Sequence, residues 1–305
     1  MDMERIASAL EAYKARLEEK DCRPLELFEG IWEIQGRHSA LAAEKSAYPL
    51  PSTEAAEHWY WQERPFLLMA PVGIDRDAFV AALEDISCYL ADNGGLEERT
   101  AKSMRSFDWH GLVDSTDAAL AGHDPQAYAD TFCALAEEHS GSALQPEVAF
   151  VVLRLALRPM LEHATSALMA SLGSVLRKGN LAHSKPLHCP GCGSEAAAAF
   201  VGETPSVQGN GRLLYCGTCG TSWEFERIRC PRCGTRNQGR LHYFHIEGDE
   251  AHRLQACDEC GGYTRTVFQE SLDAPFAFEV EDLVMTPLDR VANDPRFESR
   301  KATRQ

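Results

Sequence analysis

The first part of the chain is dominated by hydrophobic residues spaced three and four positions apart, as on one face of an amphipathic helix. The pattern predicts helices over residues 5–19 and 25–46. A third follows Asp75, a residue type that often caps a helix N-terminus, and ends before Asn93, where two glycines follow. This spacing predicts a domain built from packed helices.

Two further helices complete the pattern. Asp124 and Pro125 form an N-cap followed by proline in the first helical position. The last helix starts at Pro146 and ends at Gly179, and we expect a kink near Pro159, because proline removes a backbone hydrogen bond. Polar and charged residues interrupt the apolar part of this helix, which indicates a core helix and no membrane insertion. We therefore predict a helical domain over residues 1–185.

The rest of the chain shows strand signals. Residues 209–211, Gly-Asn-Gly, predict a hairpin turn ahead of a strand over 212–215. Residues 241–246 alternate in polarity and precede a turn at 247–249. The pattern indicates a small β region after the helical domain.

The second region of the chain also contains most of its cysteines. Three of the 11 cysteines are isolated, and the other eight form four Cys-x-x-Cys pairs. A disulfide framework is typical of small secreted chains, and this chain is long and acidic. The pairs are Cys189 with Cys192, Cys216 with Cys219, Cys230 with Cys233, and Cys257 with Cys260.

The four pairs form a tandem repeat. A shift of 41 positions moves Cys189 onto Cys230, and it superimposes the other three ligand positions of the first unit in the same way. Proline and glycine residues around the cysteines follow the same register. The repeat divides the ligands into two sets of four, one for each unit. The first set is Cys189, Cys192, Cys216 and Cys219, and the second is Cys230, Cys233, Cys257 and Cys260.

Each set matches a tetrahedral metal site. One Cys-x-x-Cys turn supplies two corners of a tetrahedron and a second turn closes it, as in zinc ribbons and rubredoxins. Glycine follows the second cysteine of every pair, where the chain has to turn tightly with positive φ. A redox-active dithiol would need only one such pair. Four thiolates accept zinc or iron, and the spacing does not distinguish the two metals.

These sites predict no catalytic centre. A four-coordinate metal has no open position for water, so metal-assisted hydrolysis is not expected. The sequence shows no nucleophile elbow, phosphate loop or metalloprotease motif, and we assign no catalytic and no cofactor-binding residues. His188, His242 and His245 lie near the cysteines, but each ligand set is already complete without them.

The net charge of the chain restricts the kinds of partner that it can bind. The chain has 46 acidic and 30 basic residues and a net charge of -16, which disfavours binding to nucleic acid or to anionic lipid. One local basic run joins the two repeats and suggests either a solvated face or a groove for an acidic partner segment. It comprises Arg227, Arg229, Arg232, Arg236 and Arg240. The chain start lacks a secretory signal pattern, so we expect a cytoplasmic protein.

The cysteine region resembles the family of the formate dehydrogenase accessory protein FdhE. The resemblance covers residues 188–270 in detail and the helical part more loosely, and residues 280–288 resemble the short closing helix of the family. It lies in the segments 189–194, 214–219, 229–233, 241–244 and 257–260, together with Trp223 and Tyr263.

This resemblance implies a non-enzymatic maturation factor that binds the catalytic (alpha) subunit of a respiratory formate dehydrogenase. In such systems the subunit holds a molybdenum or tungsten pterin and an iron–sulfur cluster, and the accessory protein assists it before export. The resemblance also favours iron in the two four-cysteine sites, with zinc as the alternative. Two other functions stay open, a rubredoxin-like electron carrier and a zinc-ribbon protein that binds nucleic acid.

The expected fold class is multi-domain α plus small β. A helical N-terminal domain, residues 1–185, precedes two tandem rubredoxin-like or zinc-ribbon modules with four cysteines each, over 186–227 and 228–270. A short helix and tail occupy residues 271–305. Because a module of about 40 residues buries little apolar surface, metal binding should supply much of its folding free energy.

Overall fold

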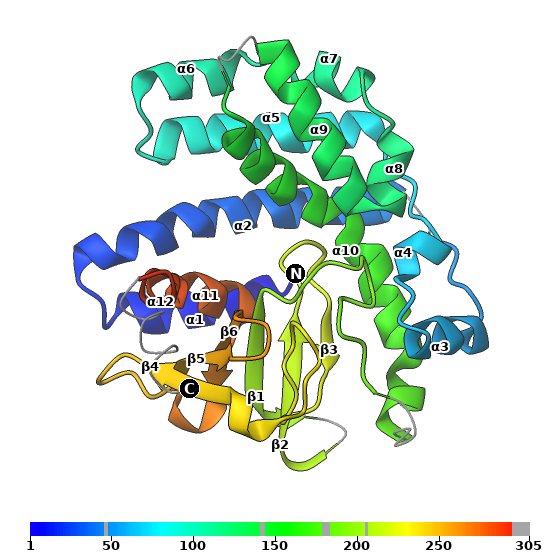
Figure 1. The fold of residues 1–305 in the computed structure, drawn as a ribbon. Coiled ribbons are helices and arrows are strands. Elements are labelled where there is room, and N and C mark those ends of the chain that lie inside the picture. Colours follow the sequence, from blue (N-terminus) through cyan, green and yellow to red (C-terminus); the bar gives the residue numbers. More distant parts are fainter. Residues whose placement is uncertain (46–47, 141–143, 179–183, 205–206, 295–305) are drawn as a thin grey trace.

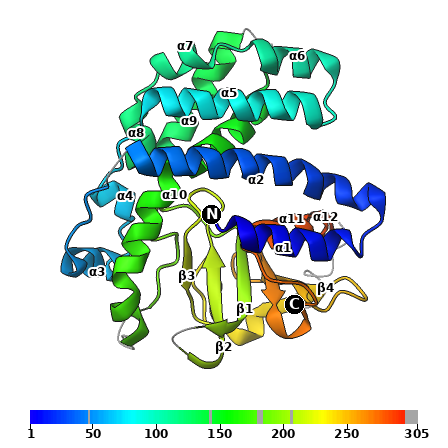
Figure 2. The same ribbon diagram turned by 180° about the vertical axis from the view of Figure 1, so that it is seen from behind.

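The structure is a computed structural model that describes residues 1–45, 48–140, 144–178, 184–204 and 207–294. Helices form the upper part of the molecule in Figure 1, and a twisted sheet lies below them. The long helix α10, Pro146–Lys178, runs from the upper helices down beside the sheet and connects the two parts. Seen from behind in Figure 2, α1 and α2 cross the molecule between the upper helices and the sheet.

The helical part contains the predicted helices and several short ones that the hydrophobic pattern does not reveal. The N-cap prediction at Asp75 is confirmed, since its carboxylate accepts a hydrogen bond of 2.8 Å from the Ala78 N–H. The helices are α1 Met3–Lys14, α2 Glu19–Lys45, α3 Thr53–Trp61, α4 Phe66–Met69, α5 Arg76–Asn93, α6 Glu98–Ser106, α7 Trp109–Asp114, α8 Ala118–His123, α9 Pro125–Ser140 and α10.

Some predicted boundaries differ from the structure. The first helix ends at Lys14, where the expected range reaches residue 19, and α2 begins at Glu19 and continues through Pro24. Helix α10 likewise continues through Pro159, and its predicted end at Gly179 lies outside the described residues. None of the described helices is long and apolar enough to cross a bilayer.

The two cysteine repeats build one continuous sheet. Its six strands lie in the order β3-β2-β1-β6-β5-β4, so each repeat contributes three neighbouring strands. Equivalent strands of the two repeats run in the same direction, and the repeats meet where β1 pairs in parallel with β6. The strands are β1 Ala198–Thr204, β2 Val207–Tyr215, β3 Ser222–Glu224, β4 Leu241–His245, β5 His252–Cys257 and β6 Tyr263–Phe268.

The hairpin turn predicted at residues 209–211 is wrong. These residues lie inside β2, where Gly211 pairs with Gly202 of β1 next to an irregularity in the register. A Cβ atom on Gly211 would lie 2.1 Å from the Thr204 hydroxyl oxygen, so glycine is needed here for the close approach of two strands. The alternating segment that begins at Leu241 does form a strand, β4.

Both faces of the central strand β1 are covered. Ala198 and Phe200 pack with the C-terminal helices, α11 Phe278–Val284 and α12 Thr286–Ala292. Ala199 points to the opposite side and belongs to the main hydrophobic core of the helical part. The single closing helix expected at residues 280–288 is therefore a pair of short helices. The expected order of a helical part, two four-cysteine units and closing helices is confirmed, whereas the domain boundaries at 185, 227 and 270 stay predictions.

A buried polar cluster joins the two ends of the chain. Glu281 of α11 is fully buried, and its carboxylate accepts hydrogen bonds from the hydroxyl of Tyr13 in α1, at 2.9 and 3.0 Å. The same carboxylate lies 2.7 Å from Nε2 of His252 in β5, and Asp249 lies 2.8 Å from the other ring nitrogen. One buried ion pair thus connects the first helix, the sheet and the closing helices.

This cluster predicts a pH-dependent part of the folding stability. Burial alone would lower the pKa of His252, but the hydrogen bonds and negative charges of Asp249 and Glu281 raise it to about 9. A histidine pKa raised on folding stabilises the fold below the unfolded value of about 6.5 and loses this effect as the pH rises to about 9. The free energy of unfolding of parent and His252→Gln, measured with urea, should therefore differ most at pH 6.5 and least above pH 9. A difference that grows with pH would contradict this assignment.

Candidate metal centre

Four loops with the same backbone geometry carry the eight predicted ligands. In the loop that begins at Cys189, the carbonyl oxygen of that residue accepts a hydrogen bond of 2.8 Å from the Gly193 N–H. The Cys189 N–H in turn donates to the Ser194 carbonyl oxygen, at 2.9 Å. The loops that begin at Cys216, Cys230 and Cys257 repeat both bonds at 2.9–3.0 Å. We call these four loops the knuckles.

The predicted role of the glycine after each second cysteine is confirmed. Its φ angle is +81° at Gly193, +73° at Gly220, +76° at Gly234 and +70° at Gly261. Residues with a Cβ atom rarely adopt this left-handed conformation. The glycines let each knuckle turn back so that both of its sulfurs face the same point.

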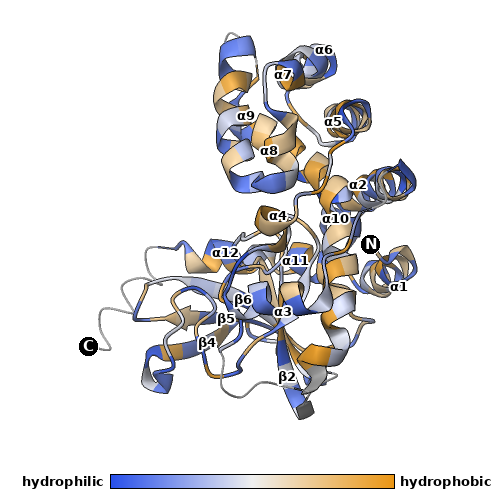
Figure 3. Ribbon diagram, turned by 90° about the vertical axis from the view of Figure 1, so that its right-hand side faces the viewer, coloured by the Kyte–Doolittle hydropathy of each residue, from blue (hydrophilic) through white to orange (hydrophobic). Residues whose placement is uncertain are grey.

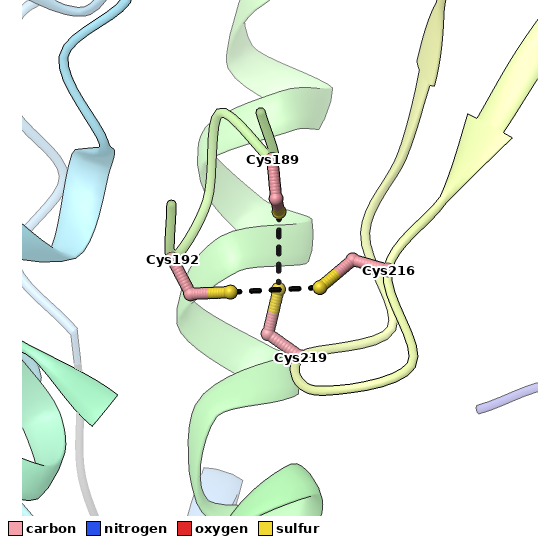
Figure 4. A group of neighbouring side chains, drawn as sticks. All are labelled: Cys189, Cys192, Cys216 and Cys219. Atoms are coloured by element: carbon pink, nitrogen blue, oxygen red, sulfur yellow. Dashed lines mark hydrogen bonds between the residues drawn. The ribbon is translucent and has the colours of Figure 1, made fainter. Parts of the chain in front are cut away.

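Two knuckles bring four sulfurs together in the first site (Figure 4). Cys189 and Cys192 precede β1, whereas Cys216 and Cys219 lie between β2 and β3. The Sγ atoms of Cys189 and Cys219 are 3.5 Å apart, as are those of Cys192 and Cys216. All four cysteines are buried. A tetrahedral ion with metal–sulfur bonds of about 2.3 Å places its sulfurs about 3.8 Å apart, so the spacing suits such an ion.

The first site is built into the helical core. The hydroxyl of Thr165 in α10 donates to the Cys219 carbonyl oxygen at 3.3 Å. The first N–H groups of α4, from Phe66 and Leu67, donate to the carbonyl oxygens of Pro190 and Gly191 at 2.7 and 3.0 Å. The four cysteines belong to the same hydrophobic cluster as the buried residues of α5, α9 and α10. Losing this site would therefore disturb the packing of the helices.

The second site is more open. The Sγ atoms of Cys230 and Cys260 are 4.0 Å apart, and those of Cys233 and Cys257 are 3.8 Å apart. Cys230 and Cys257 are buried, but Cys233 and Cys260 are exposed. This site lies where β3 leads to β4 and where β5 leads to β6, and its cysteines do not belong to the main hydrophobic core. Solvent and other molecules can therefore reach two of its four sulfurs.

Electrostatics explain why these sites fit a cation. Burial raises the pKa of the Cys189 thiol well above its usual value, and it raises that of Cys257 to about 12. Hydrogen bonds from the neighbouring thiols, that of Cys189 first, lower the pKa of Cys216. Four adjacent sulfurs cannot all carry negative charge in a poorly solvated place unless a cation compensates them. Both sets have the donors and spacing for a tetrahedral metal ion, and no histidine joins either set among the described residues.

The sequence identifies the eight cysteines and their division into two sets of four, which the structure confirms, but it misses the groups around them. Thr165 and Thr221 are examples, since the Thr221 hydroxyl lies 3.2 Å from Cys219 Sγ. A Cβ atom on Gly191 would lie 2.8 Å from the Thr221 hydroxyl oxygen and 3.2 Å from Cys219 Sγ, so this glycine leaves room for the site. No spacing pattern in the sequence identifies these residues, because their position depends on how α10 packs against the knuckles.

Each arginine of the basic run at the junction of the repeats meets an acceptor of this chain, one of them in the interior and the others nearer the surface. Arg229 is buried, and its guanidinium donates to the Lys185 carbonyl oxygen at 2.7 Å and contacts Glu226 at 3.2 Å. The other four arginines also meet acceptors of this chain, which argues against a free groove for an acidic segment. Their partners are Asn210 for Arg227, Glu195 for Arg232, Glu226 for Arg236 and Glu259 for Arg240.

The fold and the sites define a class of protein, in which paired four-cysteine sites of rubredoxin or zinc-ribbon type are attached to a helical domain. Comparisons with known proteins narrow this class. A family model described as "FdhE, central domain" matches residues 188–227, the segment that holds the first site. A crystal structure of the FdhE protein from Pseudomonas aeruginosa has the same fold, with a TM-score of 0.55 and 18% identity over 95% of this chain and 90% of that one.

Curated relatives carry the same name. Protein FdhE of Escherichia coli O9:H4 is 33% identical over 103 residues, which is 33% of this chain and 32% of the relative. Protein FdhE of Shigella boydii serotype 18 is 34% identical over 84 residues, or 27% of this chain and 26% of the relative. The chain thus matches about a third of the length of these relatives. The three comparisons together support the FdhE family for this chain.

The unequal exposure of the two sites predicts unequal metal release. With a chelator in excess, the second site should lose its ion at least about ten times faster than the first, because only its sulfurs can be attacked without opening the core. A thiol reagent should modify Cys233 and Cys260 before Cys189 and Cys219. Chelator absorbance against time, with mass spectrometry of labelled peptides, measures both. One common release rate and random labelling would contradict the difference.

Single ligand substitutions should also have unequal effects on stability. We expect Cys219→Ser to lower the free energy of unfolding by about 3 kcal/mol or more, since it weakens a metal site that is part of the main core. Cys260→Ser is the matched control at the equivalent position of the second repeat, and it should leave the helical part folded. Thermal unfolding followed by circular dichroism measures both variants. Equal losses of helix in both variants would contradict the expected difference between the two sites.

Proposed function

We propose that this chain is an accessory protein that binds the catalytic subunit of a formate dehydrogenase and is needed for the activity of that enzyme. The agreement of the three comparisons on FdhE supports this function. The observation that carries the proposal is the pair of complete four-cysteine sites, because the first one coincides with the segment that the family model matches. The protein would act before export of the subunit, in the cytoplasm.

Closed coordination supports a role without catalysis. Each set supplies four sulfurs to one ion, so a bound ion has no position left for a substrate or a water molecule. Lewis-acid chemistry at the metal is therefore not part of the proposal. The ions would stabilise the sheet and fix the shape of the surface that meets the partner.

Iron is the metal we propose, on the basis of the family resemblance, and zinc is the alternative. A rubredoxin-like electron carrier is the second candidate function, and the exposure of Cys233 and Cys260 favours it. A carrier requires a reversible one-electron couple and a red iron form. A colourless zinc protein without a redox couple would exclude the carrier and leave the accessory role intact. A nucleic-acid binder is less favoured, because the arginine run is paired internally.

The proposal predicts the phenotype of a deletion strain. Without this gene, cells should synthesise the formate dehydrogenase subunits but show no formate oxidation, and the parent gene on a plasmid should restore it. Plasmids with Cys216→Ser should not restore activity, whereas Cys88→Ser, at an exposed cysteine outside both sites, should restore it fully. Activity assays with immunoblots of the catalytic subunit test this. Normal formate oxidation in the deletion strain would refute the proposed function.

A further inference from the structure

A cavity lies where the helical part, the sheet and the closing helices meet. Its volume is about 290 Å³, and it opens beside the knuckle loop at Gly217. Aromatic and aliphatic side chains of α2 and α10 form one part of its wall. They are Phe28, Trp32, Phe150, Val151 and Leu155. None of these side chains has a role in the two metal sites.

Two buried polar residues of the cavity wall each have one atom without a hydrogen-bond partner among the described residues. Gln35 is 1% exposed, and its amide nitrogen donates to the Leu155 carbonyl oxygen at 2.8 Å, but its Oε1 atom has no donor. Arg158 is 6% exposed, and its Nε–H has no acceptor. An unpaired buried polar atom is costly. Both atoms are fully enclosed, so they are not the contacts by which the cavity would hold a ligand.

One of the three arginines around the cavity makes no direct ion pair among the described residues, although its charge interacts with that of Asp282. Arg158 pairs with Glu279, and Arg265 pairs with Asp282 at 2.5 Å. Arg154 also lines the cavity, and no hydrogen bond or ion pair holds its guanidinium among the described residues, although it lies 5.7 Å from the ring centre of Phe150. In a protein with a net charge of -16, such a cation at the mouth of an apolar cavity favours an anionic ligand.

A second cavity adjoins the first. Its volume is about 260 Å³, and it shares Phe150 and Arg154 with the first cavity. Its other walls include Ser194 and Thr218, which belong to two knuckles of the first metal site. Two cavities on either side of one arginine suit successive side chains of an extended polypeptide better than one compact small molecule.

We propose that the two cavities bind an acidic segment of the partner, in which a carboxylate lies next to an apolar side chain. The carboxylate pairs with Arg154, and the apolar side chain fills the space beside Trp32. This inference rests on the proposed function, since the segment belongs to the formate dehydrogenase catalytic subunit.

The position of this surface links it to the first metal site. A Cβ atom on Gly217 would lie 3.2 Å from Arg154 Nη2, so the knuckle loop and the guanidinium are close neighbours. A segment held by Arg154 therefore contacts the loop that carries Cys216 and Cys219. The buried ion supports the partner site by fixing this loop, without itself meeting the partner.

Binding of the purified catalytic subunit to metal-loaded protein tests the proposal. Arg154→Glu should weaken binding about tenfold or more, because it replaces an attractive charge contact with a repulsive one. Arg99→Glu is the matched control, since it makes the same charge change on α6, far from the cavities, and it should bind like the parent. Val151→Asp, at a residue that is 48% exposed at the cavity, is a second variant that should also weaken binding. Metal content and thermal stability of every variant are measured in parallel.

Overlapping synthetic peptides of the subunit then locate the segment. A binding peptide should contain Asp or Glu beside an apolar residue, and should lose affinity for the parent when that acid is changed to its amide. Equal subunit binding by the parent, Arg154→Glu and Val151→Asp would overturn the proposed surface and leave the proposed function standing. No binding by the parent would overturn both. Binding of benzoate, used as a small apolar carboxylate, in the absence of any binding peptide would also overturn the proposal, because the cavity would then be a small-molecule site.

Discussion

The convergence of four buried sulfurs on one point, as a tetrahedral cation requires, is the arrangement on which the rest of the structure depends. The first site lies inside the main hydrophobic core, and α10 and α4 both bond to its knuckles. Thiolates in such a place require a compensating charge. The helical part and the sheet are therefore not independent units, since a cation bound between these knuckles would also fix the surface against which the helices pack. Figure 3 shows α10 between the upper helices and the sheet.

Duplication explains both the likeness and the difference of the two sites. The repeats are related by a shift along the sheet, so equivalent strands run in the same direction and the units join through the parallel pair of β1 and β6. Because one repeat is displaced along the sheet relative to the other, the two repeats pack against different elements of the chain. The first meets α10, whereas the second lies outside the main hydrophobic core and exposes Cys233 and Cys260. Identical local chemistry thus yields one enclosed site and one accessible site.

The sequence predicts the local features of the cysteine sites and of a helix cap. It does not predict which segments, distant along the chain, pack against one another. The ligand partition, the glycine φ angles and the cap at Asp75 follow from spacing and residue type, and the structure has all three. The continuous sheet, the burial of the first site and the link from Tyr13 to Glu281 depend on packing between segments that are far apart in sequence. The error at Gly211 has the same origin, because a glycine required by a neighbouring strand resembles a turn glycine when only the local sequence is considered.

The most direct test of the account is the metal content and metal coordination of the purified protein. Native mass spectrometry should find two metal ions on each chain, with all eight cysteines in the four pairs free of disulfides. X-ray absorption should show four sulfur ligands at about 2.3 Å from each ion and no nitrogen or oxygen ligand. A folded chain without metal, or one whose paired cysteines are bridged as disulfides, would contradict the account.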